Sequence, residues 1–113
     1  NYDAAALAEI TAALGRAGLP GRVIIDCSHA NSGKDPARQG DVAREVAAQV
    51  AAGNRGIVGV MLESFLEEGR QDVKPGAPLV YGKSITDACM SWERTVPVLE
   101  ALAEGARARR AAE

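Results

Sequence analysis

The sequence predicts an α/β fold with parallel strands. Two short runs, Val23-Ile24-Ile25 and Gly56 to Leu62, are apolar, rich in β-branched residues and without polar alternation. Such runs are typical of parallel strands covered on both faces. A segment with helical periodicity separates them, and its length suits a βαβ unit of roughly 30 residues or more. Further helical patterns precede the first run and end the chain.

The first helix is expected to run from an Asp3 N-cap to about Ala17, where Gly18 provides a stop. Its apolar residues recur at helical spacing and form one face: Leu7, Ile10 and Leu14. After the first strand, the segment from Asp26 to Lys34 is expected to be a polar loop.

The second helix is expected to begin at Asp35-Pro36, which places an N-cap before a proline in the first turn. Its apolar residues repeat every four positions, at Val42, Val46 and Val50. Gly53-Asn54 then ends the helix and the second strand follows.

A long connection follows the second strand, from Ser64 to Thr86, and contains several glycines and prolines. Connections of this length without strong periodicity are usually functional or disordered. A last helix is expected from about Thr95 to Arg110. Its inward face should be formed by Val96, Leu99, Leu102 and Ala106.

Composition favours a protein that binds small molecules. The 113 residues are 47% hydrophobic and 25% charged, with a net charge of -2 and both signs interspersed. This balance gives no electrostatic basis for binding nucleic acid or an anionic membrane. No apolar run approaches the roughly 20 residues that span a bilayer, and no signal peptide is visible. We therefore expect a cytoplasmic location, in which Cys27 and Cys89 stay reduced.

Two parallel strands do not complete a domain. They cannot bury their own faces or satisfy their outer edges, so further strands are needed. These strands belong either to upstream chain or to partner chains. The chain opens at Asn1 without a methionine, and we favour upstream chain because it requires only a truncation.

Three residues form a candidate metal site. In parallel α/β barrels, residues just beyond the carboxyl ends of the strands point into the active site. His29 follows the first strand, Glu63 follows the second, and Asp87 lies in the long connection that can fold over the same mouth. An imidazole and two carboxylates that converge on one site are a ligand set for a divalent metal.

Each of these residues also has a structural interpretation. A histidine near a strand end is more often a hydrogen-bonded structural residue than a ligand, and Asp87 can simply cap the following turn. Glu63 is harder to dismiss, because burying a carboxylate costs several kcal/mol unless it is paired or metal-bound. The hypothesis depends on all three residues occurring at the same end of the fold.

Two other interpretations are rejected. Asn31-Ser32-Gly33-Lys34 suggests a phosphate loop, but Ser28 and Asp35 occupy positions where a Walker motif needs glycine and Ser or Thr. Cys27 has the same strand parity as His29 and could be a thiolate ligand. Buried cysteines usually behave as small hydrophobic residues, so we expect Cys27 to have a packing role.

Three long motifs resemble the C-terminal blocks of the microbial class I 3-deoxy-7-phosphoheptulonate (DAHP) synthases that are regulated by aromatic amino acids. They run from Asp26 to Ser32, from Gly59 to Ser64, and from Tyr81 to Cys89 with Trp92-Glu93. The resemblance covers essentially the whole chain, in the family's order. The related 3-deoxy-octulosonate 8-phosphate synthases lack the Gly-Lys-Ser-Ile-Thr-Asp block, and the plant-type class II enzymes differ around the histidine.

The resemblance implies the C-terminal portion of a TIM (β/α)8 barrel. Residues 1–113 would supply about two parallel strands and three helices of a single catalytic domain. It also implies a transferase that condenses phosphoenolpyruvate with D-erythrose 4-phosphate, giving DAHP and phosphate in the first step of the shikimate pathway. The family binds a divalent ion (Mn, Fe, Co or Zn) through Cys, His, Glu and Asp.

His29, Glu63 and Asp87 match the last three of these ligands, and His29 and Asp87 are the candidate catalytic residues. The metal-binding cysteine of the family belongs to an early strand absent from this chain, and Cys27 does not occupy its place. The full-length enzyme is expected to be a homo-oligomer and the isolated fragment to be inactive. The alternative is a non-catalytic barrel remnant that acts as an assembly or regulatory module.

Overall fold

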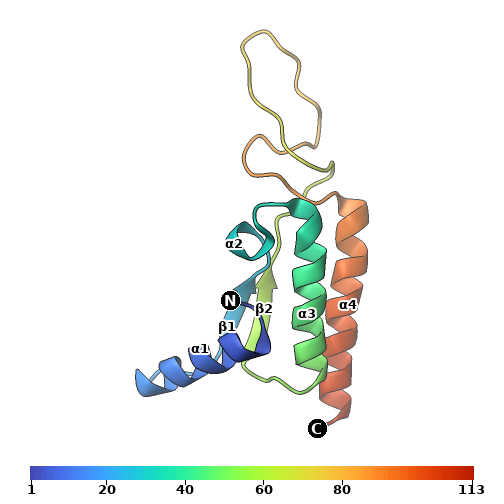
Figure 1. The fold of residues 1–113 in the computed structure, drawn as a ribbon. Coiled ribbons are helices and arrows are strands. Elements are labelled where there is room, and N and C mark those ends of the chain that lie inside the picture. Colours follow the sequence, from blue (N-terminus) through green and yellow to red (C-terminus); the bar gives the residue numbers. More distant parts are fainter.

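A computed structural model describes all residues from 1 to 113 and has an α/β architecture. The elements in chain order are α1 (Ala4–Arg16), β1 (Val23–Asp26), α2 (His29–Ser32), the 3-10 helix η1 (Pro36–Arg38), α3 (Gln39–Ala51), β2 (Ile57–Met61) and α4 (Trp92–Ala111). Helices α3 and α4 run side by side along the strands, and a long loop extends beyond them (Figure 1). No helix is both long and apolar enough to cross a membrane.

The two strands pair in parallel, as expected. Val23 lies opposite Ile57 and Asp26 opposite Met61, with one irregularity after Val23. Their carboxyl ends therefore meet at the same edge of the sheet. The amide of Cys27 donates to the carbonyl of Met61 at 3.0 Å, just beyond the last paired residue of β1.

Helices α1 and α4 begin just after residues whose side chains cap them, whereas the predicted cap Asp35 precedes the 3-10 helix η1, and α3 begins only at Gln39. The carboxylate of Asp3 accepts a hydrogen bond from the amide of Ala6 at 2.7 Å and caps α1, as expected. Ser91 caps α4 in the same way through the amide of Arg94, at 3.2 Å. Because of this cap, α4 begins at Trp92, earlier than the predicted start near Thr95.

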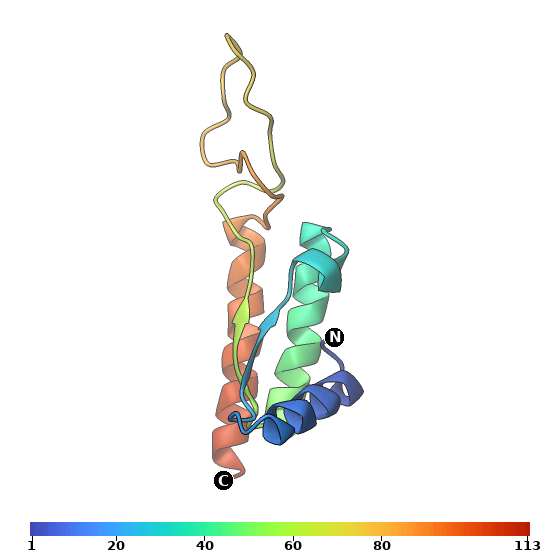
Figure 2. The same cartoon turned by 90° about the vertical axis from the view of Figure 1, so that its left-hand side faces the viewer.

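The core lies between the sheet and α3 and has two neighbouring clusters. The first consists of Leu7, Ile25, Val46, Val50 and Ile57. The second consists of Cys27, Val42, Ala43, Met90 and Val98. The predicted apolar stripe of α3 is thus confirmed, and α3 holds together the sheet, α1 and α4 (Figure 2).

Helices α3 and α4 approach each other closely at Gly105. A Cβ atom at this position would lie 2.6 Å from the carbonyl oxygen of Ala47, well inside van der Waals contact. Thr95 and Val98 share the buried face of α4 with Gly105. The predicted inward position of Leu99 is wrong, because its side chain is 44% exposed.

The expectation that both faces of the strands are covered is not met within these residues. Helices cover one face, whereas Ile24 and Val58 on the other face are 68% and 55% exposed. The physical reason is that residues 1–113 place all their long helices on one side of the sheet (Figure 2). The expected polar loop after β1 also differs, since it contains the single turn α2.

Candidate metal centre

His29 and Glu63 lie at the shared carboxyl edge of the two strands. His29 begins α2, three residues after β1 ends at Asp26, and Glu63 lies two residues after β2 ends at Met61. Because the strands are parallel and Asp26 pairs with Met61, both side chains start from the same end of the sheet.

Asp87 reaches this edge because the long loop returns to the point where it left. The amide of Met90 donates to the carbonyl of Glu63 at 2.9 Å, and the amide of Phe65 donates to the carbonyl of Met90 at 3.0 Å. These two bonds join the beginning and the end of the loop. Asp87 is three residues before this junction and is therefore held above His29.

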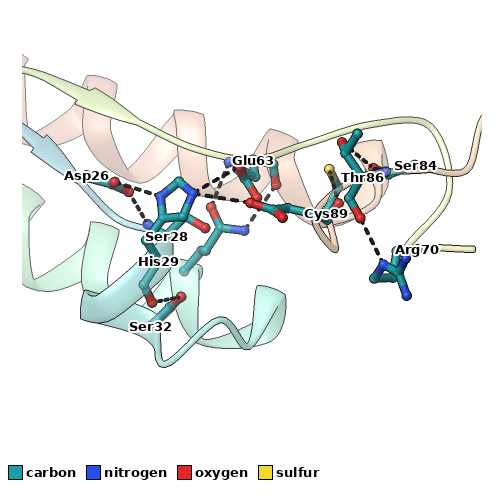
Figure 3. A network of polar contacts seen from close by, with 11 residues as sticks. Asp26, Ser28, His29, Ser32, Glu63, Arg70, Ser84, Thr86 and Cys89 are labelled. Carbon is teal, nitrogen blue, oxygen red and sulfur yellow. Dashed lines mark hydrogen bonds and ion pairs between the residues drawn. The ribbon is translucent and has the colours of Figure 1, made fainter.

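The structure brings all three predicted residues together. Nε2 of His29 lies 3.5 Å from Oε1 of Glu63 and 3.3 Å from Oδ2 of Asp87. One ligand atom from each residue lies within 4.8 Å of the other two. Figure 3 shows the imidazole of His29 between Asp26 on one side and Glu63 on the other.

Asp26 orients the imidazole of His29, a role that the sequence analysis missed. Its Oδ2 lies 2.8 Å from Nδ1 of His29, and its Oδ1 accepts from the amide of Ser28 at 2.8 Å. With the Nδ1 proton donated to Asp26, the lone pair of Nε2 faces Glu63 and Asp87. Metal-binding histidines are commonly held this way by a carboxylate.

The same carboxylates raise the pKa of His29 above its ordinary value of 6.5. The hydrogen bond that Nδ1 of His29 donates to Asp26 is the largest cause, followed by the negative charge of Asp26, and Glu63 and Asp87 add to the effect. Each of these groups stabilises the imidazolium over the neutral ring. A proton and a metal ion would therefore compete for Nε2.

The backbone of His29 has a φ of +43°, in the left-handed region. Such a conformation is uncommon for a residue with a side chain and costs on the order of 1–3 kcal/mol. The surrounding contacts hold it in place, including the bond from Nδ2 of Asn31 to the carbonyl of Asp26 at 2.8 Å.

The loop between β2 and α4 is ordered by its own polar contacts. Gln71 donates to the carbonyls of Val80 and Lys83 at 2.8 and 3.0 Å and accepts from the amide of Val80 at 2.8 Å. Nε of Arg70 donates to the carbonyl of Thr86 at 2.8 Å, next to Asp87. The two arms of the loop are thus fastened together close to the site.

A cavity of about 250 Å³ opens over the three residues. It is lined by Ser28, His29, Lys34, Glu63, Arg70, Asp87 and Ala88. Lys34 and Arg70 bring positive charge to a cavity that otherwise holds two carboxylates. One imidazole nitrogen and two carboxylate oxygens could coordinate one divalent ion, and the cavity leaves room for further ligands.

The two cysteines differ in their surroundings. Cys27 is fully buried in the second core cluster, consistent with the packing role expected from the sequence. Burial raises the pKa of its thiol to about 11, and the charge of Asp26 adds to this. Cys89 is partly exposed, and its Sγ lies 3.5 Å from the carbonyl oxygen of Asp87, close to the site.

Comparison with known proteins gives consistent matches. Residues 1–100 match the model of the DAHP synthetase I family. The Phe-sensitive phospho-2-dehydro-3-deoxyheptonate aldolase of Escherichia coli K12 is 52% identical over 110 residues, which cover 97% of this chain and 31% of that protein. The tyrosine-inhibited enzyme of Schizosaccharomyces pombe is also 52% identical, over 114 residues, with the same coverage.

A solved structure has the same arrangement of elements. The phospho-2-dehydro-3-deoxyheptonate aldolase of Francisella tularensis SCHU S4 superposes with a TM-score of 0.91 at 41% sequence identity. The match covers 96% of this chain and 31% of that one. The chain therefore spans about a third of the length of the relatives that it matches.

Proposed function

Because the chain belongs to the DAHP synthetase I family, we propose that it provides three of the metal ligands of a DAHP synthase. The proposed reaction condenses phosphoenolpyruvate with D-erythrose 4-phosphate and releases phosphate. The observation that carries this proposal is the convergence of His29, Glu63 and Asp87, whose ligand atoms lie within 4.8 Å of one another. A purely structural role would not require three polar groups from three separate segments to meet at one cavity.

The donor set fits a divalent ion such as Mn, Fe, Co or Zn. His29 would contribute Nε2, since Nδ1 is engaged by Asp26, and Glu63 and Asp87 would each contribute a carboxylate oxygen. When bound, such an ion supplies Lewis-acid polarisation of the aldehyde oxygen of erythrose 4-phosphate. Cys27 is buried in the core and is not available as a fourth ligand. The resemblance implies that this ligand is a cysteine outside residues 1–113.

Asp87 is the best placed of the three for proton transfer. It lies on a loop rather than at a strand end and is more exposed than Glu63. We propose that its carboxylate acts as a general base and accepts a proton from the water that adds to the pyruvyl carbon. His29 and Glu63, which come directly from the ends of the sheet, would mainly hold the ion in place.

The fold supports a place within a (β/α)8 barrel. The exposed sheet face at Ile24 and Val58 and the two unpaired strand edges require further strands. We propose that residues 1–113 are the C-terminal part of one barrel domain, in a cytoplasmic homo-oligomer. The substrate phosphates need several Arg and Lys contacts, and this chain offers only Lys34 and Arg70 at the cavity. The 113-residue chain alone is therefore expected to be inactive.

Phosphate release tests the proposal. The protein that carries this chain within a complete barrel should release phosphate only when phosphoenolpyruvate, erythrose 4-phosphate and a divalent metal are all present. Removal of the metal with a chelator should abolish the release, and adding Mn²⁺ should restore it. Glu63→Gln should lose most of the activity, whereas Glu67→Gln, an exposed change in the same loop, should keep it.

Three results would oppose the proposal. Full activity after chelation, or in the Glu63→Gln variant, would remove the metal from the mechanism. A folded complete protein without bound metal and without phosphate release would instead favour the non-catalytic module. Phosphate release by the isolated 113-residue chain would contradict only the expectation that this part is inactive.

A further inference from the structure

We propose that Gln39 is a positioning residue that fixes the main chain of Glu63 and thereby holds its carboxylate beside His29. This inference rests on the proposed function for its consequence, the affinity of the site for a metal. Gln39 is the first residue of α3 and is not in contact with the cavity. Its side chain acts on the site only through Glu63.

The geometry is a two-point clamp. Nε2 of Gln39 donates to the carbonyl of Glu63 at 3.0 Å, and Oε1 of Gln39 accepts from the amide of Glu63 at 2.7 Å. The side-chain amide therefore pairs with both backbone groups of one residue, as a neighbouring strand would. Two bonds to the same residue fix its orientation as well as its position.

The sheet itself does not hold Glu63. Strand β2 ends at Met61, where the carbonyl accepts from the amide of Cys27, and Glu63 has no partner in β1. The carbonyl of Glu63 accepts from Gln39 and from the amide of Met90, and its amide donates to Gln39. Without Gln39, the amide of Glu63 loses its partner inside a partly buried segment.

The burial of Gln39 argues that these bonds matter. Its side chain is fully buried, at 0% exposure, and both of its polar ends are satisfied by Glu63. Burying an amide without hydrogen bonds costs roughly 1–3 kcal/mol on the scale of protein mutations. The two bonds therefore satisfy the buried amide of Gln39 and fix the backbone of Glu63 at the same time. An apolar residue could fill the same space but could not hold Glu63.

Gln49 provides a matched control on the same helix. It lies ten residues further along α3 and donates to the carbonyl of Tyr2 at 2.7 Å, and neither residue lines the cavity. Its other amide atom, Oε1, has no partner. Gln49→Met removes a glutamine bond from α3 as Gln39→Met does, but it leaves the surroundings of Glu63 unchanged.

The experiment measures two quantities in the complete protein. Amide hydrogen exchange at Glu63 reports on the clamp without any metal, and calorimetric titration with Mn²⁺ reports on the site. In Gln39→Met, exchange at Glu63 should rise at least tenfold. The Mn²⁺ affinity should fall by about 10- to 100-fold, as is usual when a group that orients a ligand is lost. Gln49→Met should change neither quantity at Glu63 or at the metal.

The outcomes separate the inference from the proposed function. Unchanged Mn²⁺ affinity in a folded Gln39→Met protein would overturn the positioning role. If the parent binds no Mn²⁺, the proposed function fails. The positioning role of Gln39 is then tested by the place of the Glu63 carboxylate in a crystal structure of Gln39→Met. A Glu63 carboxylate still about 3.5 Å from His29, as in the parent, would then overturn it. Should Gln39→Met not fold, Gln39→Leu, which is also apolar and lacks both hydrogen bonds, is judged in the same way.

Discussion

Nδ1 of His29 lies 2.8 Å from Oδ2 of Asp26, so one ring nitrogen is occupied while the other faces the cavity. This contact selects the tautomer that presents the lone pair of Nε2 to Glu63 and Asp87. It also supplies the largest part of the rise in the pKa of His29. Asp26 therefore controls both the direction and the basicity of the imidazole.

Asp26→Asn should lower the pKa of His29 toward its ordinary value of 6.5 in the metal-free protein. Because the folded protein binds the His29 proton more tightly than the unfolded chain does, protonated His29 stabilises the folded state. This stabilisation is complete below pH 6.5 and is lost as the pH rises through the folded-state pKa. The variant should lose stability at low pH and little at high pH. NMR titration of the His29 ring protons, assigned by comparison with a His29→Gln variant, and denaturant unfolding at several pH values check the prediction. A pKa of His29 equal in both proteins would contradict it.

Asp87→Asn should reduce turnover more than metal affinity. The amide oxygen can still coordinate an ion, but it cannot take a proton from water at neutral pH. In the complete enzyme we expect a loss of kcat on the order of 10²-fold or more, with a much smaller change in the Kd for Mn²⁺. Steady-state kinetics and calorimetry measure the two effects. Equal losses in both would count against the proton-transfer role.

Cys27 and Cys89 should differ in their reaction with a thiol reagent. The thiol of Cys27 is buried and has a pKa of about 11, so almost no thiolate is present at pH 8. Cys89 is partly exposed, although burial also raises its pKa. In the folded protein the reagent should modify Cys89 slowly and Cys27 only after unfolding. Within residues 1–113, Cys89→Ser should abolish the native reaction, as peptide mapping by mass spectrometry can show, and labelling of Cys27 in the folded variant would contradict the prediction.

Gly105→Ala should destabilise the fold. A methyl group there would lie 2.6 Å from the carbonyl oxygen of Ala47, and overpacking of this kind costs about 1–3 kcal/mol. The gain in helix propensity, about 1 kcal/mol for Gly to Ala, offsets only part of this cost. Gly15→Ala in α1 is the control, because nothing lies within 4 Å of the added atom. Denaturant unfolding should show a loss in the first variant and a gain in the second.

Gln71→Ala should loosen the loop that carries Asp87. The variant loses three hydrogen bonds to Val80 and Lys83, each contributing about 1 kcal/mol. Cleavage by chymotrypsin after the exposed Tyr81 should accelerate at least about tenfold, because local opening becomes less costly. Lys74→Ala, which removes an exposed side chain from the same loop, should leave the cleavage rate unchanged. Equal rates in all three proteins would mean that Gln71 does not fasten the loop.

Much of the fold follows from local signals in the sequence. Asp3 caps α1 as predicted, and the valine repeat of α3 is buried. His29 and Glu63 could be identified because they follow apolar runs that pair in parallel. These features depend on a residue's own chemistry and on its near neighbours in the chain, which a sequence displays directly.

The remaining features depend on contacts between distant segments. Gln39 looks like an ordinary polar helix residue until Glu63, from another element, is placed beside it. The buried face of α4 was misassigned at Leu99 because Thr95 and Gly105, which are not strongly apolar, form the contact instead. A pattern of apolar residues cannot predict a helix contact that is formed by small or polar residues such as these.

The hydrogen bond between Met90 and Glu63 affects how well the loop between β2 and α4 tolerates insertions and deletions. Since the chain departs from and comes back to one anchored carbonyl, the distal turn around Pro75-Gly76 can gain or lose residues without displacing Asp87. Lengthening such an exposed tip costs little entropy. We therefore expect insertions and deletions to be tolerated best at the far end of the loop, whereas a change of length near Asp87 would move its carboxylate away from His29.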